Sequence, residues 1–207
     1  MAKPSHLFLA TVPKCGTAWL KALIFSTMHR SPHDFSSHPL LTASPHGCVP
    51  FLERQLVNYQ NDTPNDLVSH YGPYWDHVLG HRKASLESPN KVLFSKYENM
   101  KREPLANFKR LAEFMGWPFT EEEEREGVSQ AILELCSFEN NLEVNKLGVE
   151  WLSDEIVVKN SEFFRKGVVG DCENYWNLKG EMTKCLDRIT EEKFIGCGLN
   201  CDKPPKS

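Results

Sequence analysis

The sequence predicts an α/β fold in which an incomplete parallel sheet is flanked by helices. Residues 7–12 form a continuous apolar run, followed by a glycine-containing turn and a helical pattern from Thr17. A second apolar run lies within 91–97. Short continuous apolar runs are typical of strands buried on both faces, as in parallel sheets covered by helices. Because two strands alone do not make a stable sheet core, the predicted sheet is incomplete.

The predicted helices alternate with loop-rich segments. In the helix from Thr17, one face is formed by Leu20, Leu23, Ile24 and Thr27, and Ser31-Pro32 ends the helix. The segment 35–67 is rich in proline and polar residues and is expected to be mainly loop. Further helices are predicted over 74–86, 104–115, 120–135 and 181–194.

An acidic run, Glu121–Glu124, follows Thr120. The pattern T-E-E-E is a capping box, in which the threonine and the third glutamate satisfy the first free amides of a helix. Acidic side chains also suit the positive end of the helix dipole. The run is therefore interpreted as a helix start rather than a metal site.

Composition excludes several classes of protein. The 207 residues suggest one domain, and 24 Lys and Arg against 28 Asp and Glu give a net charge of −4. This balance excludes a broad basic surface for nucleic acid. No stretch approaches the roughly 18 apolar residues of a membrane span, so neither nucleic acid nor a membrane is an expected partner.

The seven cysteines are irregularly spaced, and none forms a C-x-x-C pair. This pattern encodes neither a disulfide framework nor a standard zinc site. The favoured interpretation is that the cysteines are reduced thiols that fill small apolar spaces. The disfavoured alternative is a metal cluster near the C-terminus, formed by Cys172, Cys185, Cys197 and Cys201. The predicted location is cytoplasmic.

The junction at 13–19 is the strongest chemical signal. A strand that ends in a glycine turn and opens a helix directs free backbone N–H groups and the helix dipole at one point, which suits an anion. Gly16 permits close approach of the backbone, Thr17 can cap the helix and donate a hydroxyl, and Lys14 supplies a mobile positive charge. An ordinary strand–turn–helix junction with a surface lysine would explain the same pattern equally well. A kinase or GTPase is disfavoured, because their loop places the lysine after the glycines.

Several segments, in order, resemble the cytosolic sulfotransferases, and in particular their plant branch. FLATVPKCGTAWLKALIF at 8–25 is similar to the 5′-phosphosulfate loop of that family. FFRKGVVGD at 163–171 is similar to the R-K-G-x-x-G-D-W-K segment near the family's C-terminus. The segments 38–53, 71–87 and 91–119 continue the resemblance.

This resemblance implies a P-loop-like sulfotransferase fold and the donor 3′-phosphoadenosine 5′-phosphosulfate (PAPS) as co-substrate. The acceptor would be a hydroxyl of a small metabolite such as a flavonoid or steroid, and no metal is implied. Lys14 would be catalytic and neutralise charge on the bridging oxygen, and Tyr97 would contact the nucleotide near its adenine. The 5′-phosphate would be held by Lys14, Cys15, Gly16, Thr17, Ala18 and Trp19, and the 3′-phosphate by Arg165, Lys166 and Gly167.

The departures from the family pattern are equally specific. The family has a substantial segment before its phosphosulfate loop, whereas here the loop lies almost at Met1. Near 66–69 the sequence jumps over an interval that, in the family, carries the catalytic histidine and then an R-x-P-K-D motif for the 3′-phosphate. Cys172 and Glu173 stand where the family has Trp-Lys, and Ala18 replaces a threonine.

These features leave three interpretations open. The chain is a single sulfotransferase-like domain over 1–207 with an internal deletion near 66–69. It either transfers sulfate, or is a catalytically impaired remnant that binds nucleotide, or is a truncated product without turnover. Because general-base catalysis typically supplies about 10²–10⁴-fold, the missing histidine favours little or no turnover.

Overall fold

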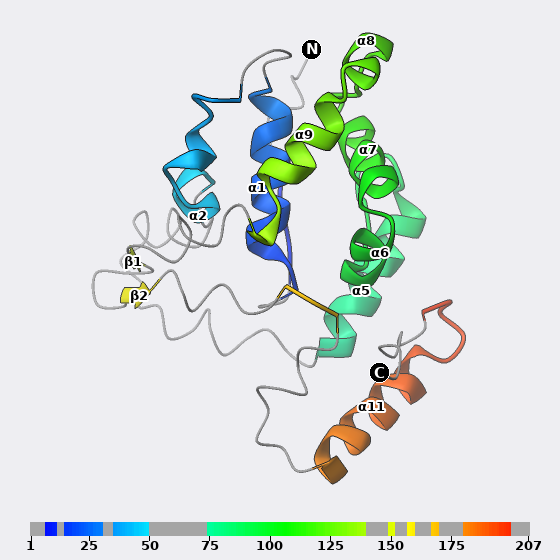
Figure 1. The fold of residues 1–207 in the computed structure, drawn as a ribbon. Helices are drawn as coiled ribbons and strands as arrows, with labels where there is room; N and C mark the ends of the chain where they lie inside the picture. Colours follow the sequence, from blue (N-terminus) through cyan, green and yellow to red (C-terminus); the bar gives the residue numbers. More distant parts are fainter. Residues whose placement is uncertain are drawn as a thin grey trace, which may run out of the picture. The chain divides into compact units, whose positions relative to one another are not determined.

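The computed structural model places residues of two compact units, which are described separately (Figure 1). The first unit is drawn from 1–61 and 102–167, and the second from 62–101 and 168–207. The structure describes residues 7–11, 15–30, 35–49, 74–139, 149–151, 157–159, 167–169 and 180–199.

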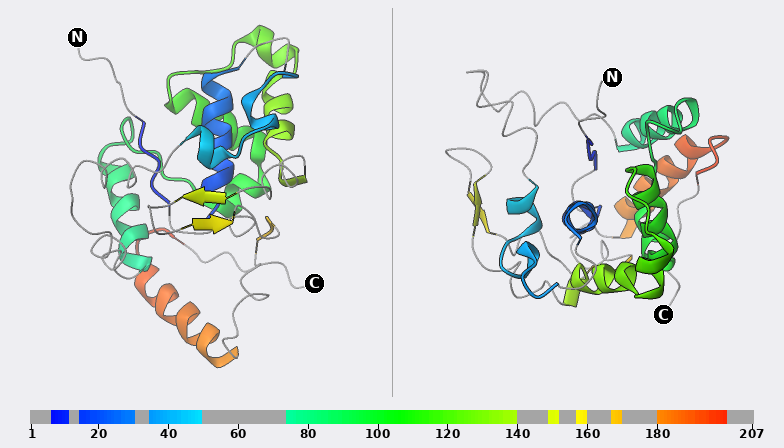
Figure 2. Two further views of the ribbon diagram at one scale, coloured as in Figure 1. Left: turned by 90° about the vertical axis from the view of Figure 1, so that its left-hand side faces the viewer. Right: turned by 90° about the horizontal axis from the view of Figure 1, so that it is seen from above.

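The first unit is built around one central helix, α1. α1 contacts α2, α7 and α9, and Figure 2 shows it end-on between α2 and the other two helices. In chain order the elements of this unit are α1 (Thr17–Met28), η1 (Pro39–Leu41), α2 (Pro45–Cys48), α7 (Pro104–Phe114), α8 (Glu121–Arg125), α9 (Val128–Leu135), β1 (Val149–Trp151) and β2 (Val157–Lys159).

The core of this unit forms where the apolar sides of these helices meet. Leu23, Phe108 and Ile132 have no exposed surface, and they come from α1, α7 and α9 respectively. α1 also buries polar residues, so it is covered on most sides rather than on one apolar face. The buried Thr27 hydroxyl donates to the Leu23 carbonyl at 2.7 Å, and this bond satisfies the polar group within the helix itself.

A buried thiol links α1 to the residue that follows α9. Sγ of Cys136 lies 3.4 Å from the Ser26 hydroxyl, and both residues are buried. Burial raises the pKa of the Cys136 thiol to about 12, although the hydrogen bond from Ser26 acts in the opposite direction. Cys136 is therefore a protonated packing residue, as expected for a structural cysteine.

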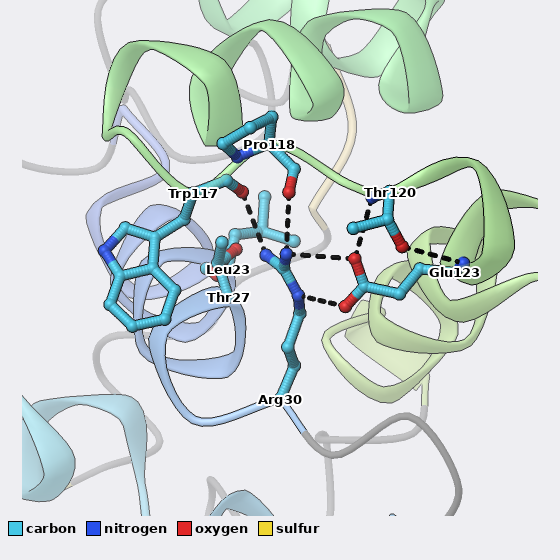
Figure 3. A network of polar contacts seen from close by, with 7 residues as sticks. All are labelled: Leu23, Thr27, Arg30, Trp117, Pro118, Thr120 and Glu123. Carbon is cyan, nitrogen blue, oxygen red and sulfur yellow. Dashed lines mark hydrogen bonds and ion pairs between the residues drawn. The ribbon is translucent and has the colours of Figure 1, made fainter.

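Arg30, just beyond the end of α1, anchors that helix to the segment before α8 (Figure 3). Its Nε donates to Glu123 Oε1 at 2.6 Å, and its Nη1 and Nη2 donate to the carbonyls of Trp117 and Pro118 at 2.9 and 2.7 Å. The guanidinium carbon also lies 4.6 Å from the centre of the Phe119 ring. One side chain thus joins a charged pair, two backbone acceptors and an aromatic face.

The capping box predicted at Thr120 is confirmed. The Thr120 hydroxyl accepts from the Glu123 amide at 3.2 Å, and the Thr120 amide donates to Glu123 Oε2 at 2.8 Å. Glu124 pairs with Lys109 at 2.7 Å. The acidic run is therefore a helix start, and Glu123 serves both the cap and Arg30.

The two strands predicted at 7–12 and within 91–97 are not formed in the described residues of these segments. Leu7 and Phe8 are 44% and 71% exposed instead of buried. An apolar run becomes a buried strand only when neighbouring strands supply hydrogen-bond partners on its sides, and none of the described residues does so. The sheet that the described residues do form is the antiparallel pair β1–β2, in which Val149 faces Lys159 and Trp151 faces Val157.

The second unit contains α5 (Tyr74–Glu87), most of α6 (Tyr97–Arg102) and α11 (Gly180–Phe194). α5 and α11 pack together, and both confirm helices expected at these positions. α6 was not predicted, because its first residue was assigned to the end of a strand. No side chain of α5 is buried. Among the described residues, no helix combines the length and apolar character needed to cross a membrane.

Candidate functional site

The start of α1 is a glycine turn that opens a helix, as the sequence predicts. Gly16 is the N-cap residue and has φ 89° and ψ 18°, a left-handed conformation that glycine adopts without steric cost. Its carbonyl accepts the first helical hydrogen bond, from the Leu20 amide at 2.9 Å. No acidic side chain lies in the first turn, so the turn itself supplies no negative charge to the positive end of the helix dipole.

Thr17 does not cap the helix, which corrects the prediction. It is the first helical residue, and the N-cap position that it was expected to serve belongs to Gly16, which makes no side-chain cap. A capping side chain needs the extended backbone of the N-cap residue in order to reach the following amides. The Thr17 hydroxyl instead hydrogen-bonds the Thr11 hydroxyl, so a polar residue in the predicted strand contacts the turn.

The remaining residues of the predicted phosphate loop are accessible. Cys15 is exposed, and the residues from Gly16 to Trp19 are half-buried. Lys14, which is predicted to supply a mobile positive charge, lies outside the described residues. The described part of the loop is therefore partly accessible to solvent.

Gly167, the glycine of the R-K-G segment, belongs to the same unit as the loop. It has φ +65°, and a Cβ at this position would lie 2.9 Å from Cδ2 of Phe138. Sequence reasoning missed Phe138, because its partner is distant in the chain. Arg165 and Lys166 lie outside the described residues, and Tyr97 is the half-buried first residue of α6 in the second unit.

A series of contacts links α1 to Gly167. α1 contacts α9, Ser26 of α1 contacts Cys136 after α9, and Phe138 follows two residues later. Phe138 lies against Gly167, so the backbone of the R-K-G segment is linked through Phe138 and Cys136 to Ser26, in the C-terminal half of α1.

We expect Gly167→Ala to destabilise the protein more than Gly116→Ala. Both glycines have positive φ, and alanine there costs about 1–2 kcal/mol in backbone strain. A Cβ at Gly116 would meet no atom within 4 Å, whereas one at Gly167 would overlap the Phe138 ring. Overpacking of this kind typically costs a further 1–3 kcal/mol or so. Urea unfolding of both variants measures the difference, and equal losses would contradict the contact with Phe138.

The two buried histidines of the first unit make contacts inside the fold. His38 is 6% exposed, and its Nδ1 accepts from the Leu40 amide at 3.2 Å. His46 is 3% exposed, and its Nδ1 lies 3.3 Å from Nζ of the buried Lys21. A general base has to reach the hydroxyl of a bound acceptor, and rings this deeply buried are poorly placed to do so. His70 lies outside the described residues, and His77 is on α5.

His38 is expected to make stability depend on pH. Burial, aided by the charge of His29, lowers its pKa from 6.5, and protonation would also remove the acceptor of the Leu40 amide. Because the folded pKa lies below the unfolded one, stability is full above pH 6.5 and falls as the pH drops below it. The slope from one group cannot exceed about 1.4 kcal/mol per pH unit.

The test is urea unfolding between about pH 5 and 8, compared with His38→Asn. Asparagine retains a capping acceptor for the Leu40 amide but does not titrate in this range. The variant should show a shallower slope than the natural protein. Identical slopes would remove His38 as the cause.

The late cysteines show no sign of a metal cluster in the part of the chain that is described. Cys185 is an exposed free thiol and Cys197 a half-buried one, while Cys172 and Cys201 lie outside the described residues. Sγ of Cys197 is directed at the Phe194 carbonyl at 2.8 Å.

Comparison with known proteins identifies the group to which this arrangement belongs. A family model described as the sulfotransferase domain matches residues 4–70 and 61–198. Flavonol 4′-sulfotransferase of Flaveria chlorifolia is 37% identical over 265 residues, which cover 96% of this chain and 82% of that protein. Cytosolic sulfotransferase 16 of Arabidopsis thaliana is 36% identical over 267 residues, covering 96% and 78%.

A solved structure agrees with these relatives. A crystal structure of an Arabidopsis thaliana protein assigned as a steroid sulphotransferase superposes with a TM-score of 0.58 at 27% identity, covering 95% of this chain and 81% of that one. The predicted α/β class is confirmed at the level of the fold, although the described residues hold few of its strands. The chain belongs to the sulfotransferase family, with plant cytosolic sulfotransferases among its relatives.

Proposed function

We propose that the chain binds PAPS with its 5′-phosphosulfate end at the start of α1. At family level the reaction is transfer of a sulfuryl group to a hydroxyl of a small molecule. The observation that carries the proposal for this chain is the left-handed Gly16, at a helix start without acidic side chains, inside the segment that matches the family. Such a helix start attracts phosphate groups through its amides and its dipole.

Each predicted residue has a defined task in this proposal. The amides from Cys15 to Trp19 and the Thr17 hydroxyl hold the 5′-phosphate, and Lys14 neutralises the bridging oxygen as the sulfuryl group leaves. Arg165, Lys166 and the Gly167 amide hold the 3′-phosphate, for which a guanidinium is well suited. Tyr97 contacts the adenine end. No metal is among these binding groups, because fixed donors and cations meet the charge of the leaving group.

We also propose that the chain lacks the internal segment that carries the catalytic histidine in relatives. Two features of the comparisons support this. The alignment with flavonol 4′-sulfotransferase runs over 265 residues, which is more than the 207 residues of the whole chain. Within the aligned region, the relative therefore has residues that have no counterpart in this chain. The family model also matches in two parts that meet within 61–70.

The structure is consistent with such a loss. Leu7 and Phe8 are exposed where a strand buried on both faces was expected, and the missing interval would supply neighbouring strands. His38 and His46 are too buried to replace the absent base. The chain is therefore proposed to retain donor binding and to have lost most turnover. The proposed acceptor is a hydroxyl of a flavonoid or steroid, and the proposed location is the cytoplasm, as for its cytosolic relatives.

Titration calorimetry with adenosine 3′,5′-bisphosphate tests the donor site. Lys14→Ala and Arg165→Ala should each weaken binding about ten- to hundredfold, since a hydrogen bond to a charged group contributes about 1.5–3 kcal/mol. Lys159→Ala is the matched control, because it removes an exposed lysine of β2. Equal affinities in the natural protein, Lys14→Ala and Arg165→Ala would contradict the site assignment.

A further inference from the structure

Two histidines of α5 lie one helical turn apart. His77 and His81 are four residues apart, so their side chains share one face of the helix. Their rings are stacked, with centroids 6.3 Å apart and planes at 26°. His81 is exposed and His77 is half-buried, so solutes can reach the pair from solvent. α5, labelled in Figure 1, belongs to the second unit.

A backbone contact sets the orientation of the His81 ring. Its Nδ1 lies 2.8 Å from the His77 carbonyl oxygen. Because a carbonyl oxygen only accepts, Nδ1 donates, and in the neutral ring the lone pair then resides on Nε2. Metal-binding histidines are usually oriented in this way, by donation of the other ring N–H to a carbonyl or carboxylate.

We propose that His77 and His81 chelate a divalent transition metal across one turn of α5. Imidazole nitrogens suit Zn²⁺, Ni²⁺ and Cu²⁺, with Cu²⁺ bound most tightly of these. The rings must move to metal–nitrogen distances of about 2.0–2.1 Å, and the exposed His81 side chain can make most of this adjustment. The proposed site has two protein ligands, with water at the other positions; among the described residues there is no group of three or more potential ligands. The inference does not depend on nucleotide binding.

Metal at this position should stabilise α5 selectively. The chelate requires the helical spacing of the two histidines, so the metal binds the folded helix better than the unfolded chain. Because no side chain of α5 is buried, local opening of this helix is expected to be comparatively easy. Slower opening of α5 is therefore the expected signature.

Amide hydrogen exchange of the full chain, with and without NiCl₂, tests the proposal. At a Ni²⁺ concentration 100 times the Kd, amides of α5 should exchange about 100-fold more slowly. The matched control combines His81→Lys with Lys83→His, which keeps the composition but separates the two histidines onto different faces. It also removes the exposed Lys83–Glu87 pair at 3.8 Å, whose loss costs little.

Protection of α5 in the natural protein, and its loss in the exchanged variant, would support the chelate. Circular dichroism without metal checks that both proteins contain the same helix. Equal protection in both, or Ni²⁺ effects confined to other segments such as those that contain cysteines, would overturn the proposal.

Discussion

Sulfate transfer by this chain is expected to be at least about 100-fold slower than transfer by a relative that contains the catalytic histidine. A positioned general base contributes about 10²–10⁴-fold to such reactions, and the buried His38 and His46 cannot supply it. The measurement is transfer from labelled PAPS to a panel of flavonoids and steroid alcohols, with flavonol 4′-sulfotransferase of Flaveria chlorifolia assayed in parallel. Turnover within tenfold of that relative would contradict the prediction.

A chimera separates loss of the base from loss of the fold. Inserting the relative's internal segment between Leu67 and Val68 should restore turnover, and Lys14→Ala in that chimera should remove it again. If the original chain already melts cooperatively and binds adenosine 3′,5′-bisphosphate, its defect is chemical. If it melts without cooperativity and the chimera melts as one transition, the segment is needed for folding, since the strands it would supply normally pair with their neighbours.

The features predicted correctly from sequence are those whose partners are near in the chain. The Thr120 capping box joins residues three apart, and the Gly16 turn needs one residue with a left-handed backbone. Helices such as α7 repeat their apolar residues within single turns, so Phe108 and Leu111 mark the buried face directly. Local rules are sufficient in these cases.

The features that were missed or predicted wrongly depend on distant partners. The run at 7–12 has the composition of a buried strand, but composition cannot say whether neighbouring strands exist. Nothing in the sequence around Phe138 indicates its contact with Gly167. The Thr17 hydroxyl hydrogen-bonds the Thr11 hydroxyl instead of capping the helix. Within the candidate site, sequence therefore predicts the backbone turn well and the side-chain partners poorly.

Arg30 illustrates this limit and leads to a large expected change in stability. Its main partner, Glu123, is 93 residues away, and the two side chains are only 11% and 12% exposed. Removing one member of a buried pair typically costs about 3–5 kcal/mol, because the other charge stays buried without compensation. Arg30→Ala should fall at the lower end of this range, since the pair is not fully buried.

Three variants identify the origin of this loss. Arg30→Lys keeps the charge but cannot donate to Glu123, Trp117 and Pro118 together, so it should remain clearly destabilised. Arg125→Ala is the matched control, because its pair with Glu122 at 3.0 Å is 74% and 70% exposed and should contribute less than about 1 kcal/mol. In a double-mutant cycle with Glu123→Ala, a coupling energy near zero would contradict the proposed pair.

Acid unfolding provides an independent measure of the same pair. Burial by itself raises the pKa of Glu123, but the hydrogen bonds and charge of Arg30, together with those from Thr120, outweigh burial and hold the pKa below 4.5. Because the folded pKa is the lower one, this stabilisation is present above pH 4.5 and is lost as the pH falls through the folded pKa. Arg30→Ala should therefore reduce the dependence of unfolding free energy on pH in this acid range. An unchanged acid slope would mean that Arg30 stabilises the end of α1 through the carbonyls and the Phe119 ring rather than through Glu123.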